Sequence, residues 1–182
     1  ILPSLTGYFY DSLIATVEEL ARIEGFSLSI FISSEDPQIE LENLKICRQR
    51  RFAGVFVSVT SKSTEFEAFR KFQEQDIPLI FIDKVPFDLK CNRVCFEDDK
   101  VAVMAAEYII KKNKRNVLSL FGDQHMSITA WREKAYQNAF ENSSCNISIE
   151  HILDTNSATQ AVLDAFSGSK NRPDAIFCMS DE

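Results

Sequence analysis

The stretch "IPLIFIDKVPFDLKCNRVCFEDDKVAVMAAEYI", residues 77–109, interrupts a regular alternation of strand-like and helix-like segments. Two short apolar runs, "LIFID" and "RVCFE", follow each other there without a helical pattern between them. A helical pattern then begins at the pair Asp98 and Asp99, which we expect to cap it. We interpret this stretch as the point where the chain leaves one α/β lobe and enters a second.

Before the interruption, apolar runs alternate with amphipathic segments. We expect strands at residues 1–3, 26–32, 53–59 and 77–83, and helices at residues 8–25, 33–51 and 64–76. Gly25 is placed to end the first helix, and Asp36 with Pro37 to begin the second. Strands that are apolar throughout and separated by helices indicate a parallel sheet covered on both faces.

After the interruption the same plan repeats. We expect helices at residues 98–112, 127–142 and 157–168, and strands at residues 116–122, 147–153 and 173–179. The predicted fold class is therefore α/β, with two tandem Rossmann-like lobes and parallel sheets, residues 1–99 and 100–182. The run at residues 93–97 is predicted to be an edge strand of the first lobe. We expect the second lobe to be incomplete, because few residues follow its last strand.

Composition narrows the class of protein. With 45% apolar and 26% charged residues the chain resembles an ordinary globular domain, and a net charge of −7 argues against a nonspecific nucleic-acid surface. No apolar run suits a membrane span and no signal-peptide pattern is visible, so we expect a cytoplasmic protein without a membrane partner. Five cysteines without a CxxC pair and two histidines favour neither a disulfide framework nor a metal site. Phosphate-binding glycine motifs are missing, so we expect no cofactor.

Candidate binding residues follow the predicted strands, because ligands of open parallel sheets bind beyond the carboxyl ends of the strands. These positions are Leu5, Thr6, Phe9, Tyr10, Ser58, Asp83, residues 122–127, Arg132, Ser180 and Asp181. We expect them to converge on a cleft between the lobes. Aromatic faces pack on C–H surfaces, and carboxylate and guanidinium groups bond hydroxyls, which suits a sugar-like or other small polar ligand.

Each of these side chains also has a purely structural interpretation. Phe9 and Tyr10 are equally explained as core residues of the first helix. Asp83 also suits a turn or capping residue, and Arg132 also suits an exposed helix residue. Asp181 suits the cap of a following helix, a role that is compatible with ligand contact.

Seven segments resemble, in their order and spacing, the effector-binding core of LacI/GalR-family transcription regulators, which has a periplasmic-binding-protein type I fold. They are "TGYFY", "SSEDPQIE", "RFAGVFV", "IPLIFID", "CFEDDKVAVMAAEYI", "ITAWREKAYQNAF" and "RPDAIFCMSDE". The likeness runs the whole length of the chain. It departs from the family pattern at Gly7 and Tyr8, which replace Asn-Pro, and at Asp99, Ala135 and Ser180, which replace Asn, Gly and Asn.

The resemblance implies a sensor that binds a sugar-like effector between its lobes and forms a homodimer. It implies control of operator DNA through an N-terminal helix-turn-helix domain that these residues do not include. It implies no catalysis, and it assigns the ligand contacts to Thr6, Phe9, Tyr10, Asp83, Arg132, Ser180 and Asp181. On this interpretation, Arg132→Ala abolishes the effector response and leaves the fold intact.

Two alternatives to a regulator remain. A periplasmic sugar-binding protein of a transporter would share the fold, and an upstream signal peptide would identify it. A Rossmann-like enzyme would need a cofactor fingerprint or a nucleophile–base pair.

Overall fold

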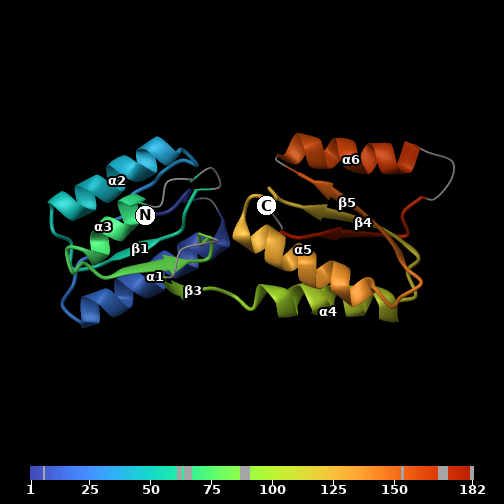
Figure 1. The fold of residues 1–182 in the computed structure, drawn as a ribbon, viewed down its shortest axis with the longest axis horizontal. Coiled ribbons are helices and arrows are strands. Elements are labelled where there is room, and N and C mark those ends of the chain that lie inside the picture. The colour runs from blue at the N-terminus through green and yellow to red at the C-terminus, as the bar shows by residue number, and fades with distance from the viewer. Residues whose placement is uncertain are drawn as a thin grey trace. The chain divides into compact units, whose positions relative to one another are not determined.

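The computed structural model describes residues 1–5, 7–60, 63, 67–86, 91–152, 154–167 and 172–180 of the 182-residue chain. Its contacts divide the chain into two compact units, Ile1–Val94 and Cys95–Glu182, which we call the N-terminal and the C-terminal unit. Helices and strands alternate in both units, and every strand pairing is parallel (Figure 1). The predicted α/β class is confirmed.

The sheet of the N-terminal unit has the order β1-β2-β3. Its strands are β1 (Val55–Val57), β2 (Leu79–Ile82) and β3 (Asn92–Val94). Val55 pairs with Leu79, and Ile80 pairs with Asn92. The second apolar run of the interrupted stretch therefore supplies an edge strand, as predicted, although β3 lies slightly earlier in the chain than expected.

The strand expected at residues 26–32 is not present as a regular strand. Only an isolated parallel bridge joins Leu2 to Ile32. The N–H of Leu2 donates to the carbonyl of Phe31 at 2.9 Å, and the N–H of Ser33 donates to the carbonyl of Leu2 at 2.9 Å. In the described part of the chain, no regular strand pairs with residues 26–30.

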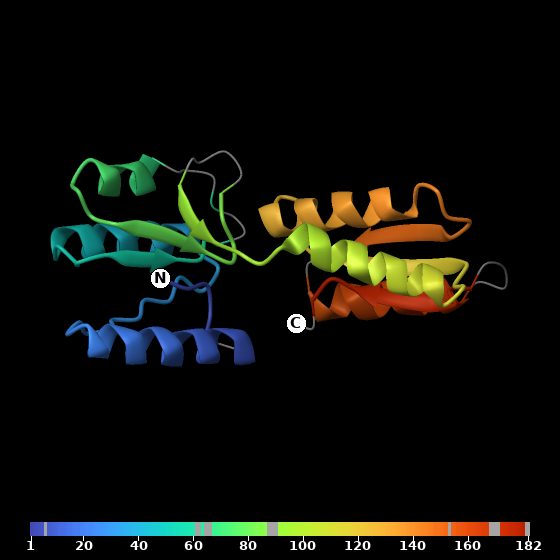
Figure 2. The ribbon, with the colours of Figure 1, turned by 90° about the horizontal axis from the view of Figure 1, so that it is seen from below.

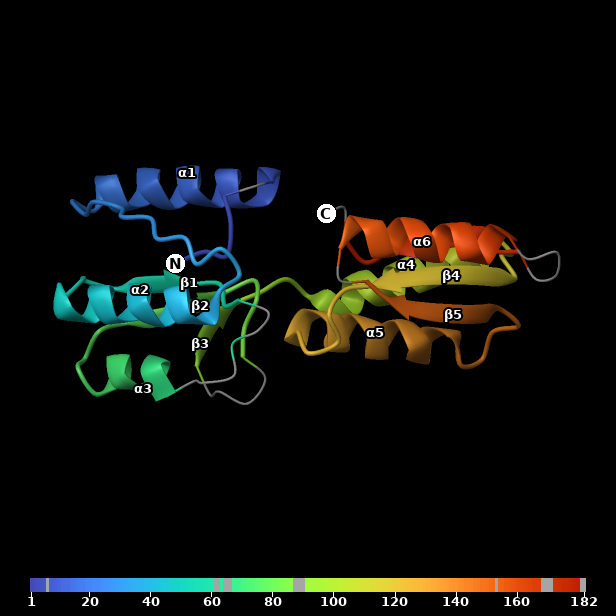
Figure 3. The same ribbon diagram turned by 90° about the horizontal axis from the view of Figure 1, so that it is seen from above.

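Helices cover both faces of this sheet. Helix α1 (Tyr8–Ile23) lies on one side and α3 (Glu67–Gln73) on the other, while α2 (Pro37–Gln49) contacts α3 (Figure 2 and Figure 3). Leu2, Tyr10 and Ile82 form a buried cluster under α1. On the α3 side, the Phe69 and Phe81 rings lie 5.2 Å apart between centroids. The apolar spacing of both helices thus translates into burial against the sheet.

Two local signals in the sequence have the predicted effect on helix ends. The Asp36 carboxylate accepts a hydrogen bond from the N–H of Gln38 at 2.8 Å, and Pro37 opens α2. Gly25 follows the end of α1 with φ of +79°, a left-handed conformation that glycine adopts without steric cost.

The sheet of the C-terminal unit has the order β5-β4-β6. Its strands are β4 (Asn116–Phe121), β5 (Asn146–His151) and β6 (Ala175–Cys178). Helices α4 (Asp98–Lys111) and α5 (Ser127–Phe140) cover one face, and α6 (Thr155–Ser167) covers the other (Figure 1). Within the described ranges, no helix is both long and apolar enough to cross a membrane.

The core of the C-terminal unit lies between β4 and the α4/α5 pair. It is centred on Tyr136, whose ring stacks on Phe177 at 4.6 Å between centroids and contacts Phe121 edge-on at 5.5 Å. The Tyr136 hydroxyl shares a 3.0 Å hydrogen bond with Ser119, which satisfies both buried polar groups. Burial raises the pKa of Tyr136 to about 12.

The expectation that Asp98 and Asp99 cap α4 is wrong. The N-cap residue is Glu97, which makes no side-chain capping bond, and the two aspartates are the first residues of the helix itself. Acidic side chains are favourable in a first helical turn because they interact with the positive end of the helix dipole. The Asp98 side chain also has a partner outside α4, described below.

Candidate functional site

Three polar side chains meet at the carboxyl ends of β1 and β2 in the N-terminal unit. The Tyr10 hydroxyl donates to Oδ2 of Asp83 at 3.2 Å and shares a 3.2 Å hydrogen bond with the Ser58 hydroxyl. Ser58 directly follows β1, and Asp83 directly follows β2. Tyr10 lies in the first turn of α1, and its two hydrogen bonds place its side chain at the same end of the sheet. Figure 3 shows α1 beside this sheet. These residues, which we call the tyrosine cluster, occupy the position that parallel sheets use for ligands.

Asp83 has both a backbone role and a side-chain role. Its φ of +57° lies in the left-handed region, which aspartate tolerates better than most residues. Its N–H donates to the carbonyl of Val94 at 3.1 Å, which ties the end of β2 to the end of β3. The turn interpretation of Asp83 is therefore correct, and the turn places its carboxylate next to Tyr10.

Phe9 and Tyr10 differ in burial although they are neighbours. Tyr10 is 3% exposed and belongs to the cluster beneath α1, so the core interpretation holds for its ring. Phe9 remains 36% exposed, with its ring edge-on to Tyr10 at 5.1 Å between centroids. A partly exposed aromatic ring therefore adjoins the polar groups of the tyrosine cluster.

A second polar cluster lies in the C-terminal unit around Arg132 of α5. Its Nε donates to Oδ1 of Asp98 at 2.9 Å, and its Nη2 lies 2.9 Å from the same oxygen. Its Nη1 donates to the carbonyl of Met179 at 2.9 Å. The guanidinium thus joins α4, α5 and the end of β6, and we call this group the arginine cluster.

The arginine cluster is mostly removed from solvent. The side chains of Arg132 and Asp98 are 16% and 4% exposed, so the interpretation of Arg132 as an exposed helix residue is wrong. Ion pairs that are removed from water are held by mutual hydrogen bonds as well as by charge. Trp131, the single tryptophan of the chain, precedes Arg132 in α5.

The loop after β4 approaches the arginine cluster closely. A Cβ atom at Gly122 would lie 3.3 Å from Cε of Met179 and 3.4 Å from Oγ1 of Thr129. A side chain there would therefore crowd the side chains of Met179 and Thr129. Glycine at this position permits the approach.

The remaining predicted contacts are placed as follows. Ser180 is exposed and directly follows Met179, so it lies beside the arginine cluster. Thr6 and Asp181 lie outside the described residues. In the described part of the chain, no group of three or more His, Cys, Asp or Glu side chains is arranged to hold a metal ion.

Asp98 is the site residue that the sequence analysis missed. The pair Asp98 and Asp99 was assigned to helix capping, because acidic residues at a helix start usually serve the backbone. The sequence signal that could have revealed the role of Asp98 is Arg132 in α5, because a buried guanidinium requires an acidic partner.

Two parallel α/β units, each with polar side chains at the carboxyl ends of its strands, define a periplasmic-binding-protein type I fold. The whole chain, residues 1–182, matches the family described as periplasmic binding proteins and sugar binding domain of LacI family. The chain belongs to this family. The resemblance seen in the sequence motifs is therefore confirmed.

Individual proteins resemble this chain in sequence or in fold. The HTH-type transcriptional regulator DegA of Bacillus subtilis is 22% identical over 184 residues, which cover 100% of this chain and 55% of DegA. The Cra transcriptional dual regulator from Pseudomonas putida in complex with fructose 1-phosphate superimposes with a TM-score of 0.85 at 20% identity, covering 97% of this chain and 66% of that chain.

The fold of a transport protein matches this chain equally well. An ABC transporter periplasmic solute binding protein from Actinobacillus succinogenes 130z with bound D-allose gives a TM-score of 0.86 at 18% identity, covering 99% of this chain and 68% of that chain. The chain therefore spans about half the length of the curated regulator and about two thirds of each solved structure.

Proposed function

We propose that this chain is the effector-binding part of a LacI-type transcription regulator, and that a sugar-like molecule binds between its two units. The observation that carries the proposal is that each sheet has its own polar cluster at the carboxyl ends of its strands. Family membership and similarity to the regulator DegA support the assignment to regulation. The proposed action is binding alone, without a catalytic step.

The chemistry of the two clusters favours an uncharged polyol. In the arginine cluster, Nε and Nη2 of Arg132 face Asp98 and Nη1 bonds Met179, which engages three of the five N–H donors of a guanidinium. The charge of Arg132 is also balanced by that of Asp98. The carboxylate of Asp83, which accepts the hydroxyl of Tyr10, is an acceptor for ligand hydroxyls and repels a phosphate placed next to it. The exposed ring of Phe9 would pack on the C–H face of a sugar.

Regulation would follow because the ligand has a different affinity for each of two arrangements of the units. A ligand that contacts both clusters binds more tightly when the units are close together, so it shifts the population towards that arrangement. In the proposed regulator the chain forms a homodimer, and the shift alters operator binding by a DNA-binding domain outside these residues. The proposed setting is the cytoplasm.

Isothermal titration calorimetry tests the binding site. D-allose, fructose and fructose 1-phosphate are titrated into the wild-type chain and into the variant Asp83→Asn. We expect an uncharged sugar to bind, fructose 1-phosphate to bind more weakly, and Asp83→Asn to weaken sugar binding by about tenfold or more, which corresponds to about 1.4 kcal/mol.

Asp76→Asn is the matched control, because Asp76 is another aspartate with positive φ and lies outside the tyrosine cluster. It should bind sugar like the wild type. Equal affinity in Asp83→Asn and the wild type would remove the tyrosine cluster from the binding site. Tighter binding of fructose 1-phosphate than of fructose would contradict the preference for an uncharged ligand.

The second candidate function is solute capture for a transporter, which the similarity to the D-allose-bound protein favours. Both functions require the same ligand site, so calorimetry does not separate them. The gene sequence upstream of Ile1 does: a helix-turn-helix region supports the regulator, and a signal peptide supports the transporter.

A further inference from the structure

Both histidines of the chain pair with carboxylates in the C-terminal unit. Nε2 of His151, the last residue of β5, lies 2.8 Å from Oε2 of Glu133 in α5. Nδ1 of His125 lies 2.9 Å from Oδ1 of Asp123, in the loop after β4. We call these four side chains the histidine cluster. The hydrogen bonds that define the arginine cluster do not include them.

The two pairs lie at the same edge of the sheet and interact with each other. Phe121, the last residue of β4, is paired with His151, so the loop that carries Asp123 starts beside His151. Partial burial by itself would raise the pKa of Asp123. The hydrogen bonds from the backbone and ring of His125 and the charges of His125 and His151 hold this pKa below its ordinary value instead. The His151 imidazole therefore acts on Asp123 as well as on its partner in α5.

The histidine cluster joins three segments of the C-terminal unit. Oδ1 of Asp123 also accepts the N–H of His125 at 2.9 Å, which closes a turn in the loop after β4. Oε1 of Glu133 accepts Nε2 of Gln137 at 3.1 Å, which holds the carboxylate on α5. The side chains of Glu133 and His151 are 20% and 32% exposed, so water screens their attraction less than that of a surface pair.

The strength of these contacts depends on the charge of the imidazoles. Imidazole is the side chain whose charge ordinarily changes between about pH 5 and pH 8. Beside a carboxylate it forms an ion pair when protonated and only a neutral hydrogen bond when it is not. The lowered pKa of Asp123 keeps this carboxylate charged throughout that range. The attraction is therefore strongest at the lower end of the range and is lost as the pH rises.

Other charged side chains near the cluster have separate environments. Arg132 is paired with Asp98. Lys134 and Glu150 are exposed, and neither forms an ion pair with another described residue. Asp154, just before α6, bonds within its own turn. The charge of the histidine cluster near neutral pH is therefore set by its two imidazoles.

We propose that the histidine cluster is a proton-sensitive clamp. With charged imidazoles it holds the loop after β4 and α5 to the end of β5, and with neutral imidazoles it releases the loop. The clamp adjoins the arginine cluster, because Gly122 lies close to Met179 and Glu133 follows Arg132. A rise in pH should thus loosen the segment that borders the arginine cluster. The inference concerns the C-terminal unit alone and is independent of the proposed function.

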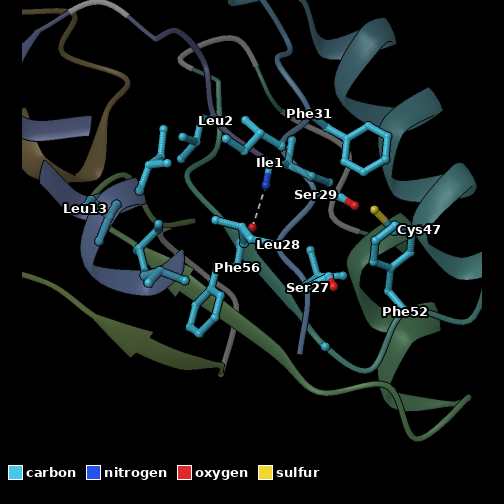
Figure 4. Close-up of a pocket in the computed structure, with 16 residues that line it drawn as sticks. Ile1, Leu2, Leu13, Ser27, Leu28, Ser29, Phe31, Cys47, Phe52 and Phe56 are labelled. Carbon is cyan, nitrogen blue, oxygen red and sulfur yellow. Dashed lines mark hydrogen bonds between the residues drawn. The ribbon is translucent and has the colours of Figure 1, made fainter. Parts of the chain in front are cut away.

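Two groups of the N-terminal unit also have pKa values shifted towards neutral pH. Burial lowers the pKa of the Ile1 ammonium, which donates to the carbonyl of Phe56 at 2.7 Å in the wall of an apolar cavity (Figure 4). Burial raises the pKa of Glu40. Because these groups are common to all variants of the C-terminal unit, their contributions cancel in a double-mutant cycle measured at a single pH.

The cycle compares the wild type, Glu133→Gln, His151→Gln and the double variant at pH 5.5 and at pH 8.0. Urea unfolding is followed by the emission of Trp131, the single tryptophan, which lies in α5. We expect the two changes to be coupled about threefold in the unfolding equilibrium constant at pH 5.5, and less than about 1.5-fold at pH 8.0. Equal coupling at the two pH values would overturn the proposal.

A second cycle tests whether the two pairs act as one cluster. It combines Asp123→Asn with His151→Gln, for which we expect coupling of about twofold at pH 5.5. Glu150→Gln with His151→Gln is the matched control, because neighbouring side chains of a strand point to opposite faces. Coupling of Glu150 as large as that of Asp123 would indicate a general effect of charge and contradict the cluster.

Amide hydrogen exchange measures the loop directly in the wild type. The amides of His125 and Met126 both bond Asp123. After correction for the intrinsic pH dependence of exchange, we expect their protection factors to fall about threefold or more from pH 5.5 to pH 8.0, and to fall less in His151→Gln. Equal protection at both pH values in the wild type would refute the clamp, and this measurement remains decisive if a variant does not fold.

Discussion

Arg132 holds three elements of the C-terminal unit together. This structural role is separate from its proposed role in ligand binding. Its guanidinium contacts the Asp98 carboxylate in α4 and the Met179 carbonyl after β6. Removing it would leave the Asp98 carboxylate, which is 4% exposed, without its positive partner. An uncompensated buried charge is among the most destabilising changes in a protein.

We therefore predict that Arg132→Ala lowers the free energy of unfolding by about 2–4 kcal/mol, measured by urea denaturation. This differs from the expectation, based on sequence alone, that the substitution leaves the fold intact. Arg115→Ala is the control, because Arg115 is an exposed arginine of the same unit, and it should change stability by less than about 0.5 kcal/mol. The double variant Asp98→Asn/Arg132→Ala should be less destabilised than the sum of its single changes.

Glu40 of α2 is a buried carboxylate that serves the loop after β1. It is 1% exposed, its Oε2 accepts the N–H of Thr60 at 2.8 Å, and its Oε1 accepts the hydroxyl of Ser63. Burial raises the pKa of Glu40, and the nearby carboxylate of Glu35 adds to the rise. The hydrogen bonds from Ser63 and Thr60 oppose it.

A raised pKa in the folded state has a definite consequence for the pH dependence of stability. Between the unfolded and the folded pKa, the folded protein binds more protons than the unfolded chain. The contribution of Glu40 to stability therefore falls as the pH rises through this interval and is constant above it. We predict that Glu40→Gln removes this fall, as measured by urea denaturation between pH 4 and pH 8. Glu42→Gln, at an exposed position of the same helix, should retain it.

At the scale of the element, α2 begins at a cap that can be tested independently of any site. The Asp36 carboxylate accepts the N–H of Gln38, one of the backbone donors that have no partner within the helix. We predict that Asp36→Ala lowers the free energy of unfolding by about 1 kcal/mol, measured by thermal or urea denaturation. Glu42→Ala in the same helix removes a carboxylate that caps nothing, and a loss as large as that of Asp36→Ala would contradict the capping role.

The sequence predicted those elements whose signals are local. Each of the six predicted helices is present, because apolar spacing, Pro37 and Gly25 act within a few residues of the element that they define. The strand at residues 26–32 could not be predicted in this way, because a strand exists only when a neighbouring strand supplies hydrogen bonds. In the described part of the chain, the strand pairing of this segment is limited to the bridge between Leu2 and Ile32.

The same distinction between local signals and long-range contacts applies to the candidate site. The positions of Asp83 and Arg132 followed from the rule that polar residues after parallel strands gather at one edge of the sheet. The pairing of Arg132 with Asp98 did not follow, because it depends on how α4 packs against α5. An acidic residue at a helix start gives the same sequence signal whether it serves the helix or a distant arginine.

At the scale of the whole molecule, each of the two units has its own sheet and its own core. If the proposed site is correct, a ligand that contacts both clusters favours a closed arrangement of the units. We predict that a saturating uncharged sugar, once identified by calorimetry, reduces the radius of gyration measured by small-angle X-ray scattering. Asp83→Asn at the same sugar concentration should show a smaller reduction, and an unchanged radius in the wild type would contradict closure.

The position of Trp131 has a spectroscopic consequence. It is the single tryptophan of the chain and lies next to Arg132, so tryptophan emission originates entirely in the C-terminal unit. Unfolding of the C-terminal unit should therefore change the tryptophan emission, whereas far-ultraviolet circular dichroism reports the helices of both units. Fluorescence and far-ultraviolet circular dichroism thus form a pair of probes, and separate transitions in the two signals would show that the units unfold independently.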